Sequence, residues 1–202
     1  MHPELGEFDV IYSDAPWSYA EVPYFKKSLA VQYQYPTLKT PELMSLDVNS
    51  LAAKNCWCFM WVVSAQLIQG LQVMESWGFK YRTIAFAWAK KTKNGKNAKT
   101  YGRCCTMQSV EICLVGKKGA PPRFAENVEQ IIEAVRTTHS TKPTEVYGRI
   151  EQIVGPDARK VELFARQSQP GWTSIGNDID GKDIREIIGM KQKEVNNGPI
   201  EV

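Results

Sequence analysis

Short apolar segments that alternate with helical patterns constrain the fold of this chain more than any other feature. The apolar segments are rich in aromatic and β-branched residues and have strand length; they lie at residues 8–13, 56–63, 81–89, 110–115, 131–135 and 161–165. Helices are expected to begin at Thr40-Pro41, at Ser64 with an end at Gly78, at Lys142-Pro143 with an end at Gly155, and at about residue 183. This alternation predicts an α/β fold with a mostly parallel sheet flanked by helices.

The composition is that of a folded globular protein. Of 202 residues, 43% are hydrophobic and 23% are charged, which predicts a single domain over residues 1–189 and a flexible polar tail over 190–202. The longest nearly unbroken apolar run, residues 56–65, is about half a membrane span, and we expect no membrane association. Five cysteines and no recognisable export signal predict reduced thiols in a cytoplasmic protein, or a nuclear one in a eukaryote.

Positive charge is concentrated in one segment. The net charge is +3, yet residues 90–103 contain six basic residues and no acidic one, so the rest of the chain is net negative. The six are Lys90, Lys91, Lys93, Lys96, Lys99 and Arg103. A polar basic loop of this kind suits a nucleic-acid backbone, although a solvated connector between strands would look the same.

The carboxyl ends of three predicted strands are the candidate ligand sites. In open α/β sheets, ligands bind beyond these ends, and the segments there are Asp14–Trp17, His139–Lys142 and the residues from Arg166 onward. Phosphate-loop, dinucleotide and hydrolase signatures are absent from the sequence. We expect no metal site, because the chain has two histidines and its cysteines lack the usual spacing of zinc ligands.

The segment Asp14-Ala15-Pro16-Trp17 carries a specific chemistry. Pro16 restricts the backbone of Ala15, so the Ala15 carbonyl and the Asp14 carboxylate form two neighbouring acceptors. They suit the amino group of adenine, whose attack on a methyl donor they would promote, while Trp17 would stack on a flipped base. The alternative is a turn or helix cap followed by a core tryptophan.

Six motifs in this order resemble the MT-A70 family of adenine amino-methyltransferases, from about Phe8 to Gly181. They are DAPW, FMWVV, VEICLVGKKG, HSTKPTEVYGRIE, KVELFAR and GWTSIGND. The resemblance implies a Rossmann-like class I methyltransferase fold, S-adenosylmethionine as cofactor, and an acceptor motif that precedes the cofactor motif. The family includes the catalytic subunit of a eukaryotic messenger-RNA enzyme and many bacterial and phage DNA enzymes.

The resemblance also assigns roles. In the acceptor motif, Asp14 to Trp17 are implied to be catalytic, with Asp14 also beside the cofactor and Tyr35 lining the acceptor pocket. The implied cofactor residues are Lys142, Phe164, Arg166, Asn177 and Asp178. Lys142 would lie near the cofactor's carboxylate, and Phe164 and Arg166 near its ribose and adenine. Asn177 and Asp178 would bind its hydroxyl groups. Read without the family, Phe164 can be a core residue, Arg166 a surface ion-pair partner and Lys142 a helix start.

Three departures from the family pattern qualify these roles. Ala15 replaces the usual first proline, which keeps the carbonyl but loses rigidity. Only 13 residues precede Asp14, so we expect no counterpart of the upstream segment that clasps the cofactor adenine in longer relatives. The segment before Glu111 lacks the aromatic residue of many microbial relatives, which leaves Glu111 weakly assigned to the site.

The leading hypothesis is therefore a methyltransferase for adenine in nucleic acid, with DNA favoured over RNA because the domain is minimal. A non-catalytic nucleic-acid-binding partner of an active relative is the alternative from another class. A methyltransferase for a free nucleotide or a protein amine is a third reading. A homodimer or heterodimer is compatible with the family.

Overall fold

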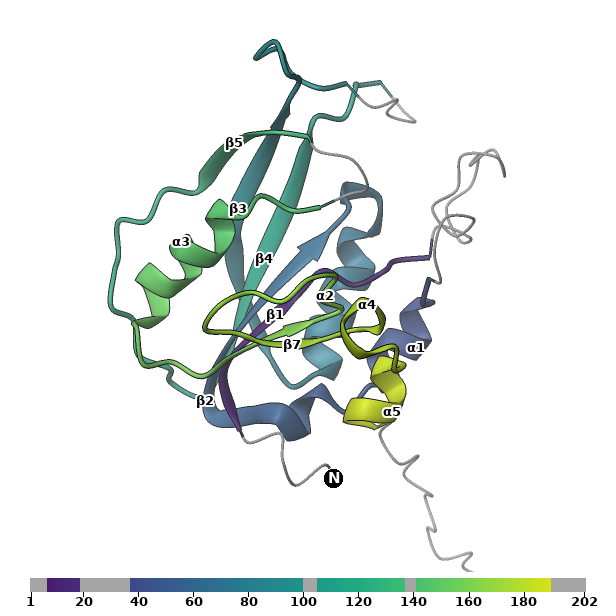
Figure 1. The fold of residues 1–202 in the computed structure, drawn as a ribbon, viewed down its shortest axis with the longest axis vertical. Coiled ribbons are helices and arrows are strands. Elements are labelled where there is room, and N and C mark those ends of the chain that lie inside the picture. The colour runs from purple at the N-terminus through teal and green to yellow at the C-terminus, as the bar shows by residue number, and fades with distance from the viewer. Residues whose placement is uncertain (1–6, 19–36, 100–104, 137–140, 190–202) are drawn as a thin grey trace, which may run out of the picture.

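One seven-stranded sheet organises the chain in the computed structural model (Figure 1), which describes residues 7–18, 37–99, 105–136 and 141–189. The strands are β1 (Phe8–Ser13), β2 (Ala52–Val62), β3 (Lys80–Lys91), β4 (Val110–Lys118), β5 (Ile131–Val135), β6 (Lys160–Leu163) and β7 (Thr173–Ile175). The helices are α1 (Thr40–Ser45), α2 (Leu67–Ser76), α3 (Glu145–Val154), α4 (Asn177–Asp180) and α5 (Ile184–Ile188). Short 3₁₀ helices span Val48–Leu51 and Ser64–Gln66.

The strand order is β5-β3-β4-β2-β1-β6-β7. Strand β4 runs antiparallel to β2 and β3, and the remaining pairs are parallel. The predicted α/β fold with a mostly parallel sheet is therefore confirmed. Because β4 is reversed, its first residues lie at the same edge of the sheet as the carboxyl ends of β1 and β2.

Strand β1 lies in the middle of the core, between β2 and β6. Its last residue, Ser13, is opposite Met60 of β2 and Leu163 of β6. Every residue of β1 except Asp9 is buried, as expected for a strand covered on both faces. The segment after β1 is thereby fixed at the carboxyl edge of the sheet.

Helices cover both faces of the sheet. On one face, Val73 and Met74 of α2 belong to the core cluster that includes Ile11 and Leu114. On the other face, Val146 and Ile150 of α3 belong to the cluster that includes Tyr12. Figure 1 shows α3 on the side of the sheet away from α1, α2 and α5. These two layers are the flanking helices that the sequence predicted.

The structure corrects several local predictions. Ser64 is the first residue of a 3₁₀ helix and makes no side-chain cap, and α2 begins at Leu67. Leu67 was expected on the buried face but is 37% exposed, because the buried face of α2 is formed by Gly70, Val73 and Met74. Strand β3 extends to Lys91, so the basic segment begins within a strand.

Further expectations concern the membrane, the thiols, metal ligands and the tail. Among the described residues, no helix is long and apolar enough to cross a membrane. Cys56, Cys58 and Cys113 are free and buried, while Cys105 is free and exposed. The described part of the chain contains no cluster of three or more histidine, cysteine or acidic residues that could hold a metal ion. The predicted tail at 190–202 lies outside the described residues.

Candidate active site

The segment after β1 forms a tight turn. The N–H of Trp17 donates to the carbonyl of Ala15 at 2.9 Å, and the N–H of Leu38 donates to the carbonyl of Pro16 at 2.8 Å. These bonds hold the backbone of Ala15 and Pro16 in place. The role of the Ala15 carbonyl as an acceptor for the substrate stays a prediction. The carbonyl oxygen of Ala15 keeps a second lone pair for another donor.

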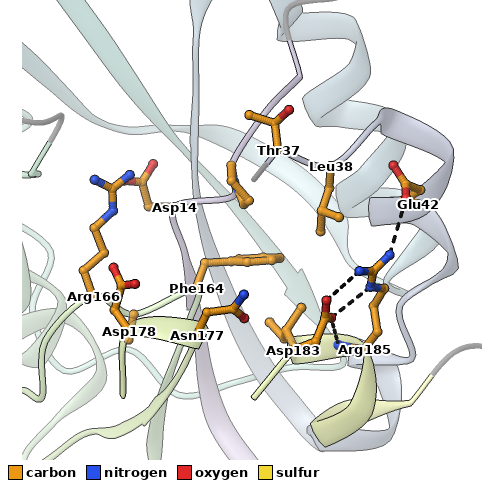
Figure 2. A pocket seen from close by; sticks show the side chains of 13 residues that line it. Asp14, Thr37, Leu38, Glu42, Phe164, Arg166, Asn177, Asp178, Asp183 and Arg185 are labelled. Carbon is orange, nitrogen blue, oxygen red and sulfur yellow. Dashed lines mark hydrogen bonds and ion pairs between the residues drawn. The ribbon is translucent and has the colours of Figure 1, made fainter. Parts of the chain in front are cut away.

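A cavity of about 370 Å³ opens in front of this turn (Figure 2). Five residues predicted to contact a cofactor or substrate line it together: Asp14, Phe164, Arg166, Asn177 and Asp178. They come from the carboxyl ends of β1 and β6 and from the first turn of α4. The structure thus brings together residues that are separated by up to 164 positions in sequence. Other residues lining the cavity are Pro16, Thr37, Leu38, Glu42, Ala165, Asp183, Ile184 and Arg185.

Backbone geometry directs Phe164 into this cavity. Phe164 follows β6 and has φ 64°, a left-handed conformation that is uncommon for a residue with a side chain. The next residue, Ala165, donates its N–H to the carbonyl of Ile175 at 2.9 Å. Figure 2 shows the ring of Phe164 in the middle of the cavity, above Asn177.

Gly176 lets two backbone segments meet beside the cavity. A Cβ atom at this position would lie 2.3 Å from the carbonyl oxygen of Ala165 and 3.0 Å from the carbonyl carbon of Phe164. Only glycine allows such a close approach. The close approach places Asn177 and Asp178, at the start of α4, next to Phe164.

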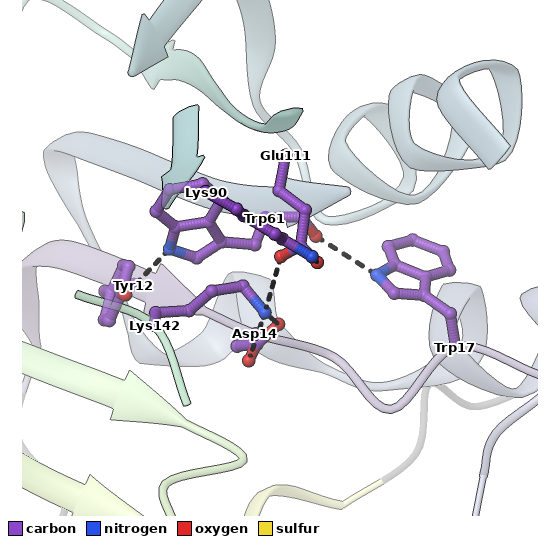
Figure 3. Close-up of polar contacts among 7 residues, drawn as sticks. All are labelled: Tyr12, Asp14, Trp17, Trp61, Lys90, Glu111 and Lys142. Atoms are coloured by element: carbon purple, nitrogen blue, oxygen red, sulfur yellow. Dashed lines mark hydrogen bonds and ion pairs between the residues drawn. The ribbon is translucent and has the colours of Figure 1, made fainter. Parts of the chain in front are cut away.

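Four charged side chains alternate in sign next to the cavity (Figure 3). The Lys142 ammonium lies 2.7 Å from each carboxylate oxygen of Asp14 and 3.3 Å from Oε2 of Glu111. The other oxygen of Glu111 accepts from Lys90. The four side chains are 11% to 21% exposed. We call Asp14, Lys142, Glu111 and Lys90 the charged chain.

The pKa values in the charged chain follow from burial and neighbours. Burial raises the pKa of the Asp14 carboxyl, and the ammonium of Lys142 offsets part of this effect. Burial also favours neutral Glu111, but Lys142 and Lys90 outweigh it and the pKa of Glu111 is lowered. For Lys142, burial favours the neutral amine, but Asp14 and Glu111 outweigh it and the pKa is raised. Lys142 therefore stays protonated beside Asp14.

A smaller cavity of about 70 Å³ shares Asp14 with the main cavity and is also lined by Lys142, Tyr147 and Glu162. The hydroxyl of Tyr147 donates to Oε2 of Glu162 at 2.8 Å. Burial raises the pKa of Glu162 to about 7, against a partial offset by the Tyr147 hydrogen bond. Glu162 precedes Leu163 in β6, and nothing in its sequence pattern distinguished it from an exposed strand residue.

Trp17 lies in the core of this structure. Its residue is 5% exposed, and the indole N–H donates to the Trp61 carbonyl at 3.1 Å. Trp17 therefore packs as a core tryptophan, which was the alternative to base stacking in the sequence analysis. Base stacking by Trp17 stays a prediction, and it requires that the ring become uncovered.

The basic segment divides into paired and exposed residues. Lys90 faces inward to Glu111, and Lys91 lies 2.8 Å from Glu133 and 3.0 Å from the Asn97 carboxamide oxygen. Lys90 is paired with the partly buried carboxylate of Glu111 in this structure, and its predicted contact with phosphates stays a prediction. The exposed members among the described residues are Lys93, Lys96 and Lys99. Arg103 and the predicted acceptor-pocket residue Tyr35 lie outside the described residues.

Sequence reasoning assigned Glu111 only weakly to the site and did not identify one end of the cavity. Glu111 is the second residue of β4, and only the antiparallel course of that strand brings it to the site. Glu42, Asp183 and Arg185 line the cavity from α1 and from the start of α5. Their helices were predicted, but no motif marked these three residues.

Comparisons with known proteins identify the family of this chain. The sequence model of the MT-A70 family matches residues 8–178. The chain is 37% identical to "Type II methyltransferase M.MunI" of Mycoplasma sp. over 91% of this chain and 84% of that protein. It is 34% identical to the human "N(6)-adenosine-methyltransferase catalytic subunit METTL3" and 36% identical to an Arabidopsis thaliana "N(6)-adenosine-methyltransferase MT-A70-like", each over 88% of this chain. The chain spans 29% and 24% of the length of these two relatives. This chain belongs to the MT-A70 family.

Proposed function

We propose that this protein is an S-adenosylmethionine-dependent methyltransferase that modifies the exocyclic amino group of adenine in nucleic acid. The observation that carries the proposal is that a single cavity is lined by Asp14, Arg166, Asn177 and Asp178. Residues from three separate strand ends thereby offer polar partners for the hydroxyl groups of a ribose and, with Phe164, an apolar surface in one cavity. The similarity to proteins named N(6)-adenosine-methyltransferases supports the choice of adenine.

The cavity fits the cofactor in size and chemistry. A volume of about 370 Å³ is within the usual range for small-molecule sites. Asn177 and Asp178 offer acceptors and a donor for hydroxyl groups, and Phe164 offers an apolar surface. When bound, S-adenosylmethionine supplies a methyl group on a positively charged sulfonium.

Asp14 and Ala15 position the substrate amino group in this proposal. Lys142 occupies one direction on each Asp14 oxygen, and an ionised carboxylate has about four acceptor sites in all. Asp14 can therefore accept one N–H of the amino group while it keeps its ion pair, and the Ala15 carbonyl can accept the other. Both acceptors stabilise the positive charge that develops on the nitrogen as it attacks.

Lys93, Lys96 and Lys99 are proposed to contact the phosphate backbone. DNA is favoured over RNA, because the type II methyltransferase is matched over most of its length and the N(6)-adenosine relatives over a third or less. We propose a location in the cytoplasm, or in the nucleus of a eukaryote, and a nucleic-acid substrate and the free thiols support this proposal. We also propose that residues 1–189 form a single methyltransferase domain and that the protein forms a homodimer or a heterodimer.

A non-catalytic binding partner is the second candidate, because Lys142 occupies both oxygens of Asp14 in this structure. Calorimetry with S-adenosylmethionine separates the two, since a subunit with no functional cofactor site should release no binding heat.

Mass spectrometry of nucleosides tests the function directly. DNA and RNA are incubated separately with isotopically labelled S-adenosylmethionine, and labelled N6-methyladenine is expected in DNA. Asp14→Ala should abolish the label, while Asp157→Ala, at an exposed position that does not line the cavity, should retain it. Substantial transfer by the Asp14 variant would show that the catalytic assignment is wrong.

A further inference from the structure

The main cavity has a second charged end, which the proposed methyl transfer does not use. Glu42 of α1, Arg185 of α5 and Asp183, the N-cap of α5, line it. In Figure 2 these three lie on one side of the Phe164 ring, and Asp14 and Arg166 lie on the other. We call Glu42, Asp183 and Arg185 the distal end of the cavity.

Contacts hold the distal end in a defined geometry. The Arg185 guanidinium bonds Asp183 through Nε at 2.8 Å and through Nη2 at 2.5 Å, and its Nη1 lies 3.6 Å from Oε1 of Glu42. The second oxygen of Glu42 accepts the backbone N–H of Lys39 at 2.8 Å, which fixes the carboxylate at the first turn of α1. The side chains of Glu42 and Arg185 remain 40% and 43% exposed. An acceptor and a donor therefore lie side by side and stay accessible.

The walls between the two charged ends are partly apolar. Leu38, Phe164 and Ile184 line the same cavity as the distal end. An apolar slot that ends in a donor and an acceptor suits a flat heteroaromatic ring with polar groups along one edge.

We infer that the distal end binds the adenine base of the cofactor, with Glu42 accepting from the exocyclic amino group and Arg185 donating to a ring nitrogen. This inference rests on the proposed function. It also follows the arrangement in Figure 2: Asp14 lies at one end with Asp178, the proposed hydroxyl partner Asn177 lies next to the Phe164 ring, and the distal end is on the other side of that ring. The cofactor has the same order, since its ribose lies between its sulfonium and its base.

The pairing predicts discrimination against hypoxanthine. Adenine places an amino donor beside a ring-nitrogen acceptor, whereas hypoxanthine places a carbonyl acceptor beside a ring N–H donor. At the distal end, hypoxanthine would set its carbonyl against the Glu42 carboxylate and its N–H against the Arg185 guanidinium. Both polar contacts would then be lost or repulsive.

Calorimetry of the full chain with S-adenosylhomocysteine and S-inosylhomocysteine tests this inference, because the two ligands differ only in the base. The wild type should bind S-adenosylhomocysteine at least about ten-fold more tightly than S-inosylhomocysteine, since the loss of a single hydrogen bond in a site has an effect of this size. Glu42→Gln and Arg185→Met should reduce the ratio to about two-fold, because glutamine can donate as well as accept and methionine cannot donate. Glu186→Gln, an exposed charge change on the same helix α5, should leave the ratio unchanged.

Three results would overturn the inference. Equal binding of both ligands by the wild type would exclude base recognition at the distal end. An unchanged ratio in both variants, with a lowered unfolding temperature, would show that the three residues only join α1 to α5. Binding of neither ligand by the folded wild type would refute the proposed function as well, so the failures are distinguishable. Should Arg185→Met not fold, Glu42→Gln decides alone.

Discussion

Lys142 and Asp14 form an ion pair in which one ammonium lies 2.7 Å from both carboxylate oxygens. The pair sets the orientation of Asp14 at the end of β1, because a bidentate contact fixes the plane of the carboxylate. Glu111, at 3.3 Å, holds the same ammonium from the other side. The catalytic carboxylate of the proposal is therefore positioned by residues from β4 and from the segment before α3.

Lys142→Met should shift the pH dependence of methyl transfer. Transfer requires ionised Asp14, so the rate rises with pH through the pKa of this carboxyl, which burial has already raised. Without the ammonium, the attraction that offsets burial is lost and the pKa rises further. The acid limb of kcat/KM should therefore move to higher pH, and the rate at pH 7 should fall by on the order of 10- to 100-fold.

Lys118→Met is a suitable control for this measurement, because Lys118 binds backbone carbonyls at the opposite end of β4. Its acid limb should coincide with that of the wild type. An acid limb that Lys142→Met leaves in place would show that a group other than Asp14 sets the pH dependence.

Most of the fold followed from apolar patterning. The bounds of β1 and β5 agree with the predicted segments, and Gly155 ends α3 as expected. The patterning could not reveal β7 and α4, because three and four residues are too few to show a period. It also could not give the direction of β4, which is decided by pairing with β2 and β3.

The candidate site was predictable where a motif marks a strand end, as at Asp14 and Arg166. It was not predictable where a side chain acts through tertiary pairing. Lys90 shows this limit, since charge counting grouped it with exposed lysines, while the structure pairs it with Glu111. The alternation of buried Phe86 and Trp88 continues to Lys90 and points it inward, but the sequence does not show that Glu111 lies there to pair with it.

The exposed lysines of the basic segment should determine the salt dependence of nucleic-acid binding. Replacing Lys93, Lys96 and Lys99 by glutamine should weaken duplex binding and reduce the slope of log K against log salt by about 2 to 3, since each phosphate contact contributes about 0.9. Lys90→Gln should leave the slope almost unchanged, because Lys90 is already paired with Glu111. Fluorescence anisotropy over a salt series measures both. Equal slopes for the triple variant and the wild type would exclude this surface as the phosphate contact.

Glu162 should make the protein less stable as the pH rises. Its pKa is 4.5 when exposed and about 7 in the fold, so the folded state retains a proton that the unfolded chain loses. The free energy of unfolding should therefore decrease between about pH 4.5 and pH 7. Glu162→Gln keeps an acceptor for Tyr147 and cannot ionise. At pH 8 the free energy of unfolding of this variant should exceed that of the wild type by on the order of 1–3 kcal/mol, and at pH 4 the two should differ little.

Thermal unfolding at both pH values measures the effect of Glu162. Glu75→Gln, at an exposed position of α2, serves as the control and should shift neither value. A Glu162 variant that melts at the wild-type temperature at pH 8 would mean that the carboxyl ionises in the fold as easily as in water.

Gly176→Ala should damage the cavity, whereas Gly148→Ala should not. The new methyl group at 176 would meet the Ala165 carbonyl oxygen at 2.3 Å, so β7 and the segment after β6 must separate. We expect a loss of about 1–3 kcal/mol in unfolding free energy and weaker binding of S-adenosylhomocysteine, because Phe164 and Asn177 move apart. Gly148 lies in α3 with open space around its Cβ position, and alanine there should add about 0.5–1 kcal/mol. Chemical denaturation and calorimetry measure the two quantities, and wild-type affinity in a destabilised Gly176→Ala protein would mean that the close approach supports the fold without shaping the cavity.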